Sequence, residues 1–314
     1  MNKGGIFHRF GHSGKPTLPY HIGAAIAVTA WGAAFINTKV LLSHGLNPVE
    51  IYVYRFIIAY LCVLVLCPKP LFCHKISDEF KFLLCGLCGG SIYFIAENTA
   101  VNYTMVSNVS LIVSTSPLLT AIIIGVMYKS ERPTKGFMMG SAIAFLGVGC
   151  VIFNSSFVVK LKPFGDMLAL LSALCWAVYS VVLRPLNATY SVWFVTRKTF
   201  FYGLVTSLPF LALEPHLASP GLLMEPAVWG NLLFLGLFAS LISYLLWSQA
   251  VKGLGVMTSG NYLYVSPIVT LLLSKFYLGE NISWIGYAGC ALIILGLVAS
   301  EKLGGSRGEG AMRH

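Results

Sequence analysis

Charged side chains are scarce in this chain of 314 residues. Asp, Glu, Lys and Arg together make up 10% of it, whereas soluble domains carry about 25%. So few charges cannot cover a surface that faces water. Hydrophobic residues make up 57% of the chain, and its mean hydropathy is +0.78. These values predict a membrane protein whose apolar side chains face lipid tails.

Signatures of several functional classes are also lacking. No nucleotide-binding loop is present, so we expect no direct coupling to ATP and no cofactor. The seven histidines lie in tails, loops or span edges, which argues against a metal site and histidine-based catalysis. The eight cysteines show no disulfide spacing. Cys85 and Cys88 form a C-x-x-C inside an apolar stretch, where packing is favoured over redox chemistry.

The net charge of +10 does not indicate a nucleic-acid partner. The basic residues fall in short connections between apolar runs, whereas a nucleic-acid binder gathers them on one soluble surface. The first apolar run has no small-residue cleavage site and is followed by more such runs. It is therefore predicted to be the first membrane span and not a signal peptide.

Ten apolar runs have the length of about 20 residues that a helix needs to cross the hydrocarbon core. They lie between two polar tails, residues 1–19 and 301–314, both expected in the cytoplasm. The predicted spans are 21–42, 48–67, 80–100, 105–127, 134–153, 164–183, 191–213, 228–250, 257–275 and 283–300. Very short connections make consecutive helices antiparallel neighbours.

The two halves of the chain resemble each other. From Gly86 onward, equivalent residues are separated by 149 or 150 positions. The matched pairs include Trp31 with Trp176, Arg55 with Arg197, Gly86 with Gly236, Ala100 with Ala250, Ser116-Pro117 with Ser266-Pro267, Tyr128 with Tyr277, Glu131 with Glu280, Gly140 with Gly289 and Gly147 with Gly296. The pattern predicts one five-helix repeat over 20–154 and a second over 155–300.

The second repeat is predicted to be inverted relative to the first, because each contains an odd number of spans. With the N-terminus inside, the cytoplasmic segments hold fourteen lysines and arginines against three outside, a strong positive-inside bias. The matched connections also differ: 68–79 carries two lysines and 214–227 carries none. We therefore expect an all-α membrane protein of ten transmembrane helices in two inverted five-helix repeats, acting as a monomer in the cell membrane.

Inverted repeats are typical of secondary transporters, in which two similar bundles rock about a central site. A channel would need charge rings or a carbonyl filter. An intramembrane enzyme would need acids, histidines or a nucleophile grouped at depth. Neither pattern is visible, so transport of a small-molecule substrate is predicted.

The two halves together resemble the drug/metabolite transporter superfamily, and most closely its EamA-type ten-helix exporters. Each half has a Trp early in its first helix, a Ser-Pro in its fourth, and a Tyr-x-x-Glu leading into a Gly-rich fifth. The resemblance covers about residues 20–300. It implies export, or less often import, of small metabolites such as amino acids. It also implies a cavity lined by spans 1, 3, 4, 6, 8 and 9. Nucleotide-sugar and phosphorylated-metabolite exchangers of the same superfamily are the alternative.

Two prolines occupy equivalent places inside the fourth and ninth spans, at Pro117 and Pro267. A proline within a helix removes a backbone donor and bends the helix. Matched interruptions in the two halves of a transporter point to a hinge or to its site. A passive packing kink is the alternative.

Polar residues recur at steps of three on the same two spans. They are Asn108 and Ser114 on the fourth span, and Asn261 and Tyr264 on the ninth. Such spacing places side chains along one stripe of a helix. We expect the stripe to face the interior, where it lines the cavity or bonds neighbouring helices.

Glu97 is an ionisable residue within the third span, and Lys39 lies at similar depth in the first. An ionisable group inside a span is functional by default. Glu97 is therefore a candidate for binding a substrate amine or a coupled proton, gated by a pairing with Lys39. A static ion pair near the interface is the alternative.

Arg55 and Arg197 are equivalent in the two repeats, each about two turns into a span. They are candidates for holding a carboxylate or phosphate, although gating one face or pairing with a helix end is favoured. A group of aromatic residues is predicted to line the cavity by stacking on substrate, with core packing as the alternative. These residues are Trp31, Tyr93, Trp176, Tyr179, Tyr244 and Trp247.

Overall fold

A computed structural model describes residues 17–68, 72–73, 75–104, 106–128, 132–152, 162–278 and 282–304. The predicted boundary between the repeats at 154/155 lies outside these residues, as do most of both polar tails. The described part of the chain is helical and contains no strand.

The described residues form ten helical passages, several of them built from more than one helix. The first five are α1 (Leu18–Ser43); α2 (Pro48–Leu66); α3 (Ile76–Gly86) with η1 (Leu87–Ser91) and α4 (Ile92–Tyr103); α5 (Val106–Val113) with α6 (Ser116–Met127); and α7 (Lys135–Ile152). The second five are α8 (Pro163–Thr189); α9 (Val192–Ala212); α11 (Pro226–Leu233) with η3 (Phe234–Ile242) and α12 (Ser243–Leu254); α13 (Val256–Asn261) with η4 (Tyr262–Val265) and α14 (Ser266–Leu278); and α15 (Trp284–Gly304). A short helix, α10 (Pro220–Leu223), lies between α9 and α11.

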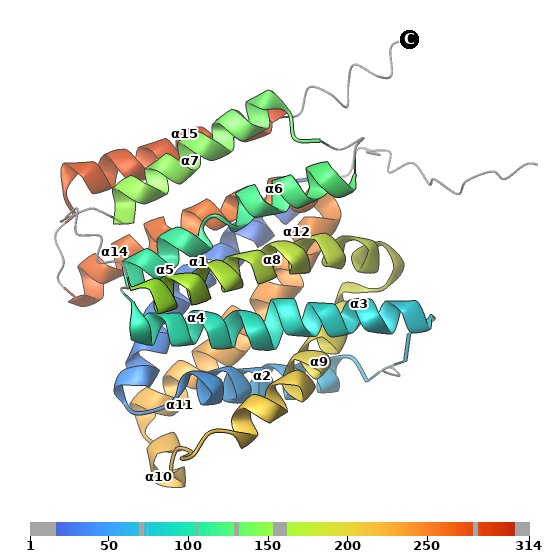
Figure 1. Cartoon of the computed structure of the whole chain (residues 1–314), viewed down its shortest axis with the longest axis vertical. Coiled ribbons are helices and arrows are strands. Elements are labelled where there is room, and N and C mark those ends of the chain that lie inside the picture. Colours follow the sequence, from blue (N-terminus) through green and yellow to red (C-terminus); the bar gives the residue numbers. More distant parts are fainter. Residues whose placement is uncertain are drawn as a thin grey trace, which may run out of the picture.

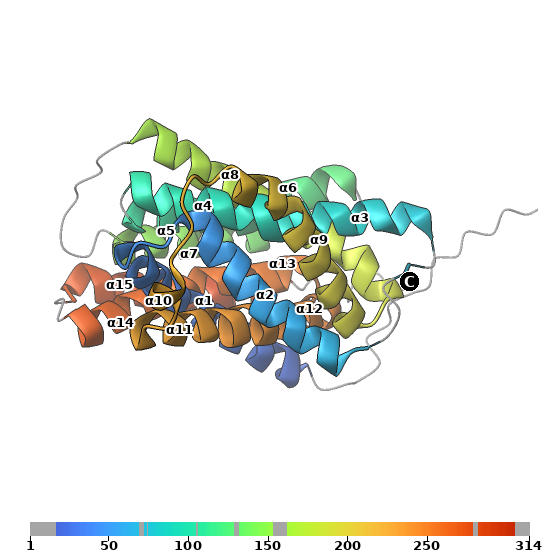
Figure 2. The same cartoon turned by 90° about the horizontal axis from the view of Figure 1, so that it is seen from below.

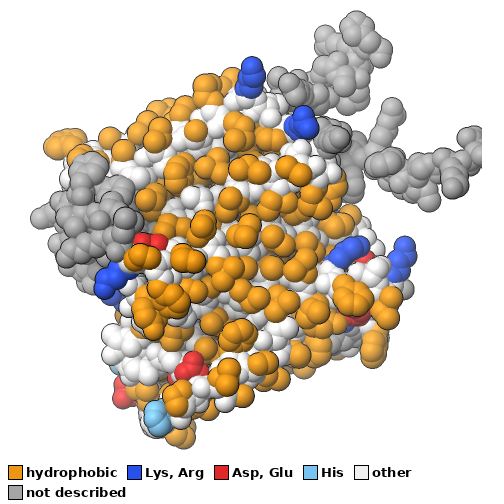
Figure 3. Space-filling model, in the orientation of Figure 1, with side chains coloured by type: hydrophobic (Ala, Val, Ile, Leu, Met, Phe, Trp, Pro, Cys, Tyr) orange, Lys and Arg blue, Asp and Glu red, His pale blue; other side chains and the backbone are white. Residues whose placement is uncertain are grey.

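These passages have the character of membrane spans. Eight are long and apolar enough to cross a membrane, and α7 is a shorter apolar helix. The remaining one, α9, has 21 residues but includes the charged Arg197 and Lys198. Figure 3 shows hydrophobic side chains spread over the flank of the bundle, with most charged ones toward the helix ends. The predicted ten-helix, all-α membrane fold is confirmed.

Two layers make up the middle of the bundle, and each contains helices from both halves. One layer holds α3 with α4, α5 with α6, and α8, and the other holds α1, α12 and α14 (Figures 1 and 2). Passages 3, 4 and 6 therefore face passages 1, 8 and 9, which are their equivalents in the other repeat. α2 and α9 flank the layers, and α7 packs against α15 at one edge.

Helix irregularities occur at matched places in the two repeats. The third and eighth passages each contain a π-helical segment, η1 and η3, and within η1 the backbone of Gly90 is non-helical, at φ −140° and ψ −106°. The fourth and ninth passages are each interrupted just before a Ser-Pro pair, at which α6 and α14 begin. Such segments are frequent at functional sites and point to this region of the bundle.

Candidate functional site

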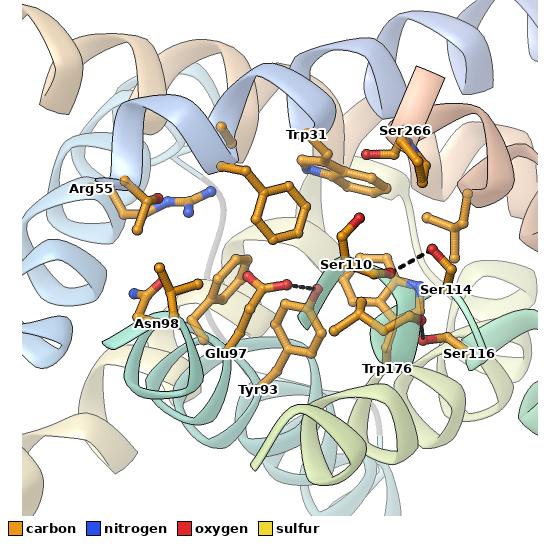
Figure 4. A pocket seen from close by; sticks show the side chains of 18 residues that line it. Trp31, Arg55, Tyr93, Glu97, Asn98, Ser110, Ser114, Ser116, Trp176 and Ser266 are labelled. Atoms are coloured by element: carbon orange, nitrogen blue, oxygen red, sulfur yellow. Dashed lines mark hydrogen bonds between the residues drawn. The ribbon is translucent and has the colours of Figure 1, made fainter. Parts of the chain in front are cut away.

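A cavity lies between the two layers (Figure 4). Its empty space is about 750 Å³ when the part open to the exterior is included. Its lining comes from α1, α2, α4, α5, α6, α8, η4 and α14. The described lining residues are Trp31, Ala34, Phe35, Thr38, Arg55, Tyr93, Phe94, Glu97, Asn98, Val101, Ser110, Val113, Ser114, Ser116, Trp176, Leu263, Ser266 and Pro267.

The cavity lies away from the end of the bundle at which α1 begins and α15 ends. Those two helix termini are neighbours, because His21 of α1 lies 3.6 Å from Glu301 of α15. The cavity is lined instead by the second half of α1, by α4, which is the second half of the third passage, and by α5. We call the end with His21 and Glu301 the terminal end, and the other the opposite end.

Glu97 projects into the cavity from α4. Its Oε1 accepts a hydrogen bond of 2.7 Å from the hydroxyl of Tyr93, one helical turn earlier, and the residue is 8% exposed. Figure 4 shows this bond in the middle of the lining residues. Glu97 is the only acidic residue among the described lining residues. It can attract a cationic group of a substrate or carry a proton.

Arg55 enters the cavity from α2, which the sequence did not place in the lining. Its Nε donates to Ser240 Oγ at 2.9 Å, and its Cζ lies 4.5 Å from the centre of the Phe94 ring. Nη2 has no hydrogen-bond partner among the described residues, although the residue is only 1% exposed. A buried donor without an acceptor costs free energy, so this atom is suited to an anionic group.

Two equivalent tryptophans meet across the layers. Trp31 of α1 and Trp176 of α8 have ring centroids 5.0 Å apart in an edge-to-face arrangement. Trp31 Nε1 donates to the carbonyl of Ala239 at 2.8 Å, which fixes its ring. Both line the cavity, as predicted, and Ser114 and Pro267 lie there as well.

Tyr179, Tyr244 and Trp247 are predicted to line the cavity together with the two tryptophans, but they are not among its described lining residues. They are at most 1% exposed and pack beneath the two tryptophans, with Trp247 5.2 Å from the ring of Trp31. The hydroxyl of Tyr244 donates to the carbonyl of Gly89 in η1. Because these large rings fill the space between helices, the eighth passage packs against the residues of the site but contributes none to the described lining.

The predicted pairing of Lys39 with Glu97 is wrong. Thr38 faces the cavity and Lys39 is exposed. Successive residues of a helix point about 100° apart, so a side chain next to Thr38 is turned away from Glu97. The cation that shares the cavity with Glu97 is Arg55.

The predicted polar stripe on the ninth passage faces a different neighbour. Asn261 accepts from Ser141 Oγ at 3.1 Å and donates to Ser300 Oγ at 2.7 Å, so it bonds α13 to α7 and α15. Tyr264 is fully buried in an apolar cluster with Ala144 and other residues. The side chain of Asn108 lies outside the described residues. The interhelical alternative is the correct one for Asn261.

Arg197 and Pro117 lie outside the described cavity lining, whereas Pro267 is part of it. Arg197 Nη1 donates to the carbonyl of Cys67 at 2.6 Å, at the end of α2, as the favoured interpretation predicted. Pro117 and Pro267 do not bend a continuous helix; each is the second residue of a new one, α6 or α14. Proline is well tolerated in a first turn, because its missing N–H has no partner there.

Several lining residues were not singled out from the sequence, including Phe35, Thr38, Asn98, Ser110 and Ser266. Helical spacing would have found some of them. Thr38 lies two turns after Trp31 on α1, and Val101 lies one turn after Glu97 on α4. Extending a stripe from each confirmed residue would therefore have located these positions.

Comparison with known proteins identifies the family. The sequence model of the EamA-like transporter family matches the chain twice, over residues 18–153 and 163–300. The chain belongs to this family. The resemblance to EamA-type drug/metabolite transporters is thereby confirmed, and each EamA match contains one set of five helical passages.

Relatives of similar length support this membership of the EamA family. An uncharacterized transporter of Archaeoglobus fulgidus is 28% identical over 275 residues, covering 87% of this chain and 95% of the relative. A probable terminal-alkyne amino-acid exporter of Streptantibioticus cattleyicolor is 26% identical over 279 residues, covering 88% and 91%. A solved structure titled "Crystal structure of protein" superposes with a TM-score of 0.72 at 18% identity over 92% of this chain and 96% of that one. That likeness shows the fold alone.

Proposed function

We propose that this EamA-family protein is a secondary transporter that exports small metabolites, such as amino acids, across the cytoplasmic membrane by alternating access. It acts as a monomer with both chain termini in the cytoplasm. The observation that carries the proposal is the cavity between two layers, each built from helices of both repeats. Rocking of one layer against the other would open such a cavity first to one side and then to the other.

Amino acids suit the chemistry of this cavity. Glu97 offers a carboxylate to an ammonium group, and aromatic side chains such as Trp31 and Trp176 offer apolar surface. One of the relatives is named a probable amino-acid exporter. The described lining contains a single basic side chain, Arg55, whereas phosphorylated ligands are often recognised by clusters of arginines. This favours an amino acid over a nucleotide sugar or a phosphorylated metabolite.

Counter-flow in proteoliposomes tests the transport proposal directly. Liposomes containing the purified protein are loaded with an equimolar mixture of the standard amino acids, and the external medium is analysed by mass spectrometry. We expect efflux of a subset that saturates with concentration and is accelerated by the same amino acid outside. Unsaturable conductance would indicate a channel, and chemical change of a solute in detergent would indicate an enzyme.

Ionic contacts connect the two repeats at the terminal end, on the other side of the bundle from the cavity. Lys198 of α9 lies 2.8 Å from Glu79 of α3, and only 4% of its side chain is exposed. Tyr202, one turn later on α9, donates to the same carboxylate at 2.5 Å. In this proposal the contacts of Lys198 and Tyr202 with Glu79 close the cytoplasmic side while the cavity faces outward. These contacts must break when the protein opens inward.

Replacing Lys198 with methionine is expected to favour the inward-open state. The pair connects two repeats and is only partly exposed, so its loss shifts the equilibrium by roughly 1 to 2 kcal/mol, about five- to thirtyfold. The measurement is the rate at which a charged maleimide, applied from the cytoplasmic side, labels Cys67 in a background without the other cysteines. Cys67 is buried at the end of α2, so its labelling reports opening.

Lys81→Met is the matched control. Lys81 pairs with Asp78 at 2.7 Å within α3 and does not connect this helix to α9. Its loss should leave the labelling rate of Cys67 unchanged. Equal rates in the wild type and in Lys198→Met would contradict the closing role of the pair.

A further inference from the structure

Arg55 and Arg197 occupy equivalent positions in the two repeats but have different surroundings. The guanidinium of Arg197 is directed to the end of α2, where it donates to the carbonyl of Cys67. That of Arg55 lies in the cavity and points toward the middle of the lining residues (Figure 4). Of these two equivalent arginines, Arg197 therefore binds to the end of a neighbouring helix, and Arg55 lies at the site.

The surroundings of Arg55 leave part of its hydrogen-bonding capacity unused. Nε is held by Ser240 and the plane of the group lies near Phe94, so its orientation is fixed. Nη2 finds no acceptor among the described residues. A fixed guanidinium with a free donor in a buried site is well suited to a carboxylate, because hydrogen bonds between charged groups are stronger than neutral ones.

Arg55 and Glu97 line the same cavity without pairing with each other. No ion pair joins them in the part of the chain that the structure describes, where the carboxylate of Glu97 is bonded to Tyr93. Opposite charges that are buried and unpaired are costly in a membrane. A molecule with one negative and one positive group, placed between them, would neutralise both.

We propose that Arg55 binds the carboxylate of the substrate and Glu97 its ammonium group, so that the cavity selects α-amino acids with both charges free. This inference rests on the proposed transport function and specifies its substrate class. The cavity would exclude amines that lack a carboxylate and acids whose nitrogen is acylated. Apart from Arg55 and Glu97 the described lining is uncharged, so the side chain of the substrate is expected to be neutral.

Ligand-induced stabilisation of the full-length protein in detergent tests this inference without requiring transport. The probes are the standard amino acids, each added at several concentrations while the melting temperature is measured. For the amino acid with the largest shift, its methyl ester and its N-acetyl derivative are then compared with the parent compound. We expect a neutral amino acid to bind, and each derivative to require at least tenfold more ligand for the same shift.

Variants assign the two charges to the two residues. In Arg55→Gln the preference for the amino acid over its methyl ester should disappear, and Arg55→Lys should keep part of it. In Glu97→Gln the preference over the N-acetyl derivative should disappear. Arg197→Gln is the matched control: it should lower the melting temperature without ligand but leave both preferences unchanged. A purely structural role for Arg55 would alter stability and not the ratio between acid and ester.

Three results would overturn the inference. One is an unchanged acid-to-ester preference in Arg55→Gln, and another is equal binding of the ester by the wild type. The third is that none of the amino acids stabilises the protein. Saturable counter-flow of another metabolite would then still support the transporter proposal. Failure of the amino-acid inference can therefore be distinguished from failure of the proposed transport function.

Discussion

Replacing Glu97 with glutamine is expected to lower the efflux of amino acids from proteoliposomes by about ten- to a hundredfold. A hydrogen bond to a charged group contributes about 1.5 to 3 kcal/mol, and the amide cannot supply the negative charge that an ammonium group needs. The volume of the side chain hardly changes, and Tyr93 can still donate to the amide oxygen. The loss should therefore appear in flux and not in folding. Initial rates with equal amounts of reconstituted protein measure it.

Glu225→Gln is the control for this substitution. Glu225 is exposed at the start of α11, where its side chain makes no capping hydrogen bond. Its replacement should leave the flux unchanged. If transport proves to be coupled to protons, Glu97→Gln should also remove the pH dependence of any residual flux. Wild-type rates and wild-type pH dependence in Glu97→Gln would exclude Glu97 as both the amine site and the coupling site.

The sequence determines the membrane fold in considerable detail, because lipid imposes a simple rule on helix length and polarity. Ten apolar runs became ten helical passages, and the family match covers each half. The irregular segments were harder to predict from the sequence. The interruptions before Ser116 and Ser266 were indicated by the following prolines, but the π-helical segments η1 and η3 were not. Those segments depend on how several helices pack, which no local pattern records.

The sequence predicted some of the lining residues. Trp31, Tyr93, Glu97 and Trp176 line the cavity. Tyr179, Tyr244 and Trp247 were proposed for the same reason as the other aromatic residues, but they are buried outside the described lining. Orientation about the helix axis was harder to predict. Lys39 is next to a lining residue in the sequence, but its side chain is directed away from the cavity. Span boundaries that are uncertain by a few residues do not determine which side of a helix faces the cavity.

The internal repeat also predicts equivalent positions more reliably than equivalent chemistry. Ser141, Asn261 and Ser300 form a hydrogen-bonded group that joins α7, α13 and α15. The offsets of 149 and 150 place their counterparts in the other repeat at Cys290, Leu111 and Val151, which belong to an apolar cluster. Arg55 and Arg197 differ in the same way. Two inverted halves can thus keep a common architecture while their polar residues acquire separate roles.

Replacing Gly147 with alanine is expected to lower the melting temperature by about 4 to 5 °C. Gly147 of α7 meets Gly289 of α15, and a Cβ added to Gly147 would lie 2.7 Å from the carbonyl oxygen of Gly289 and from the amide nitrogen of Ile293. Backbone atoms cannot turn aside as a flexible side chain can, so the two helices must separate. Overpacking of this kind costs about 3 kcal/mol, and in a chain of 314 residues each kcal/mol corresponds to about 1.5 °C.

Gly149→Ala provides a control on the same helix, because a Cβ added to Gly149 meets nothing within 4 Å. Alanine has a higher helix propensity than glycine, so this variant should be as stable as the wild type or slightly more stable. The pair separates close helix contact from any general effect of adding a methyl group to α7. Melting curves in detergent, with size-exclusion profiles to confirm a monodisperse protein, give both values. If Gly147→Ala melts at the same temperature as Gly149→Ala, the contact of α7 with α15 does not depend on these glycines.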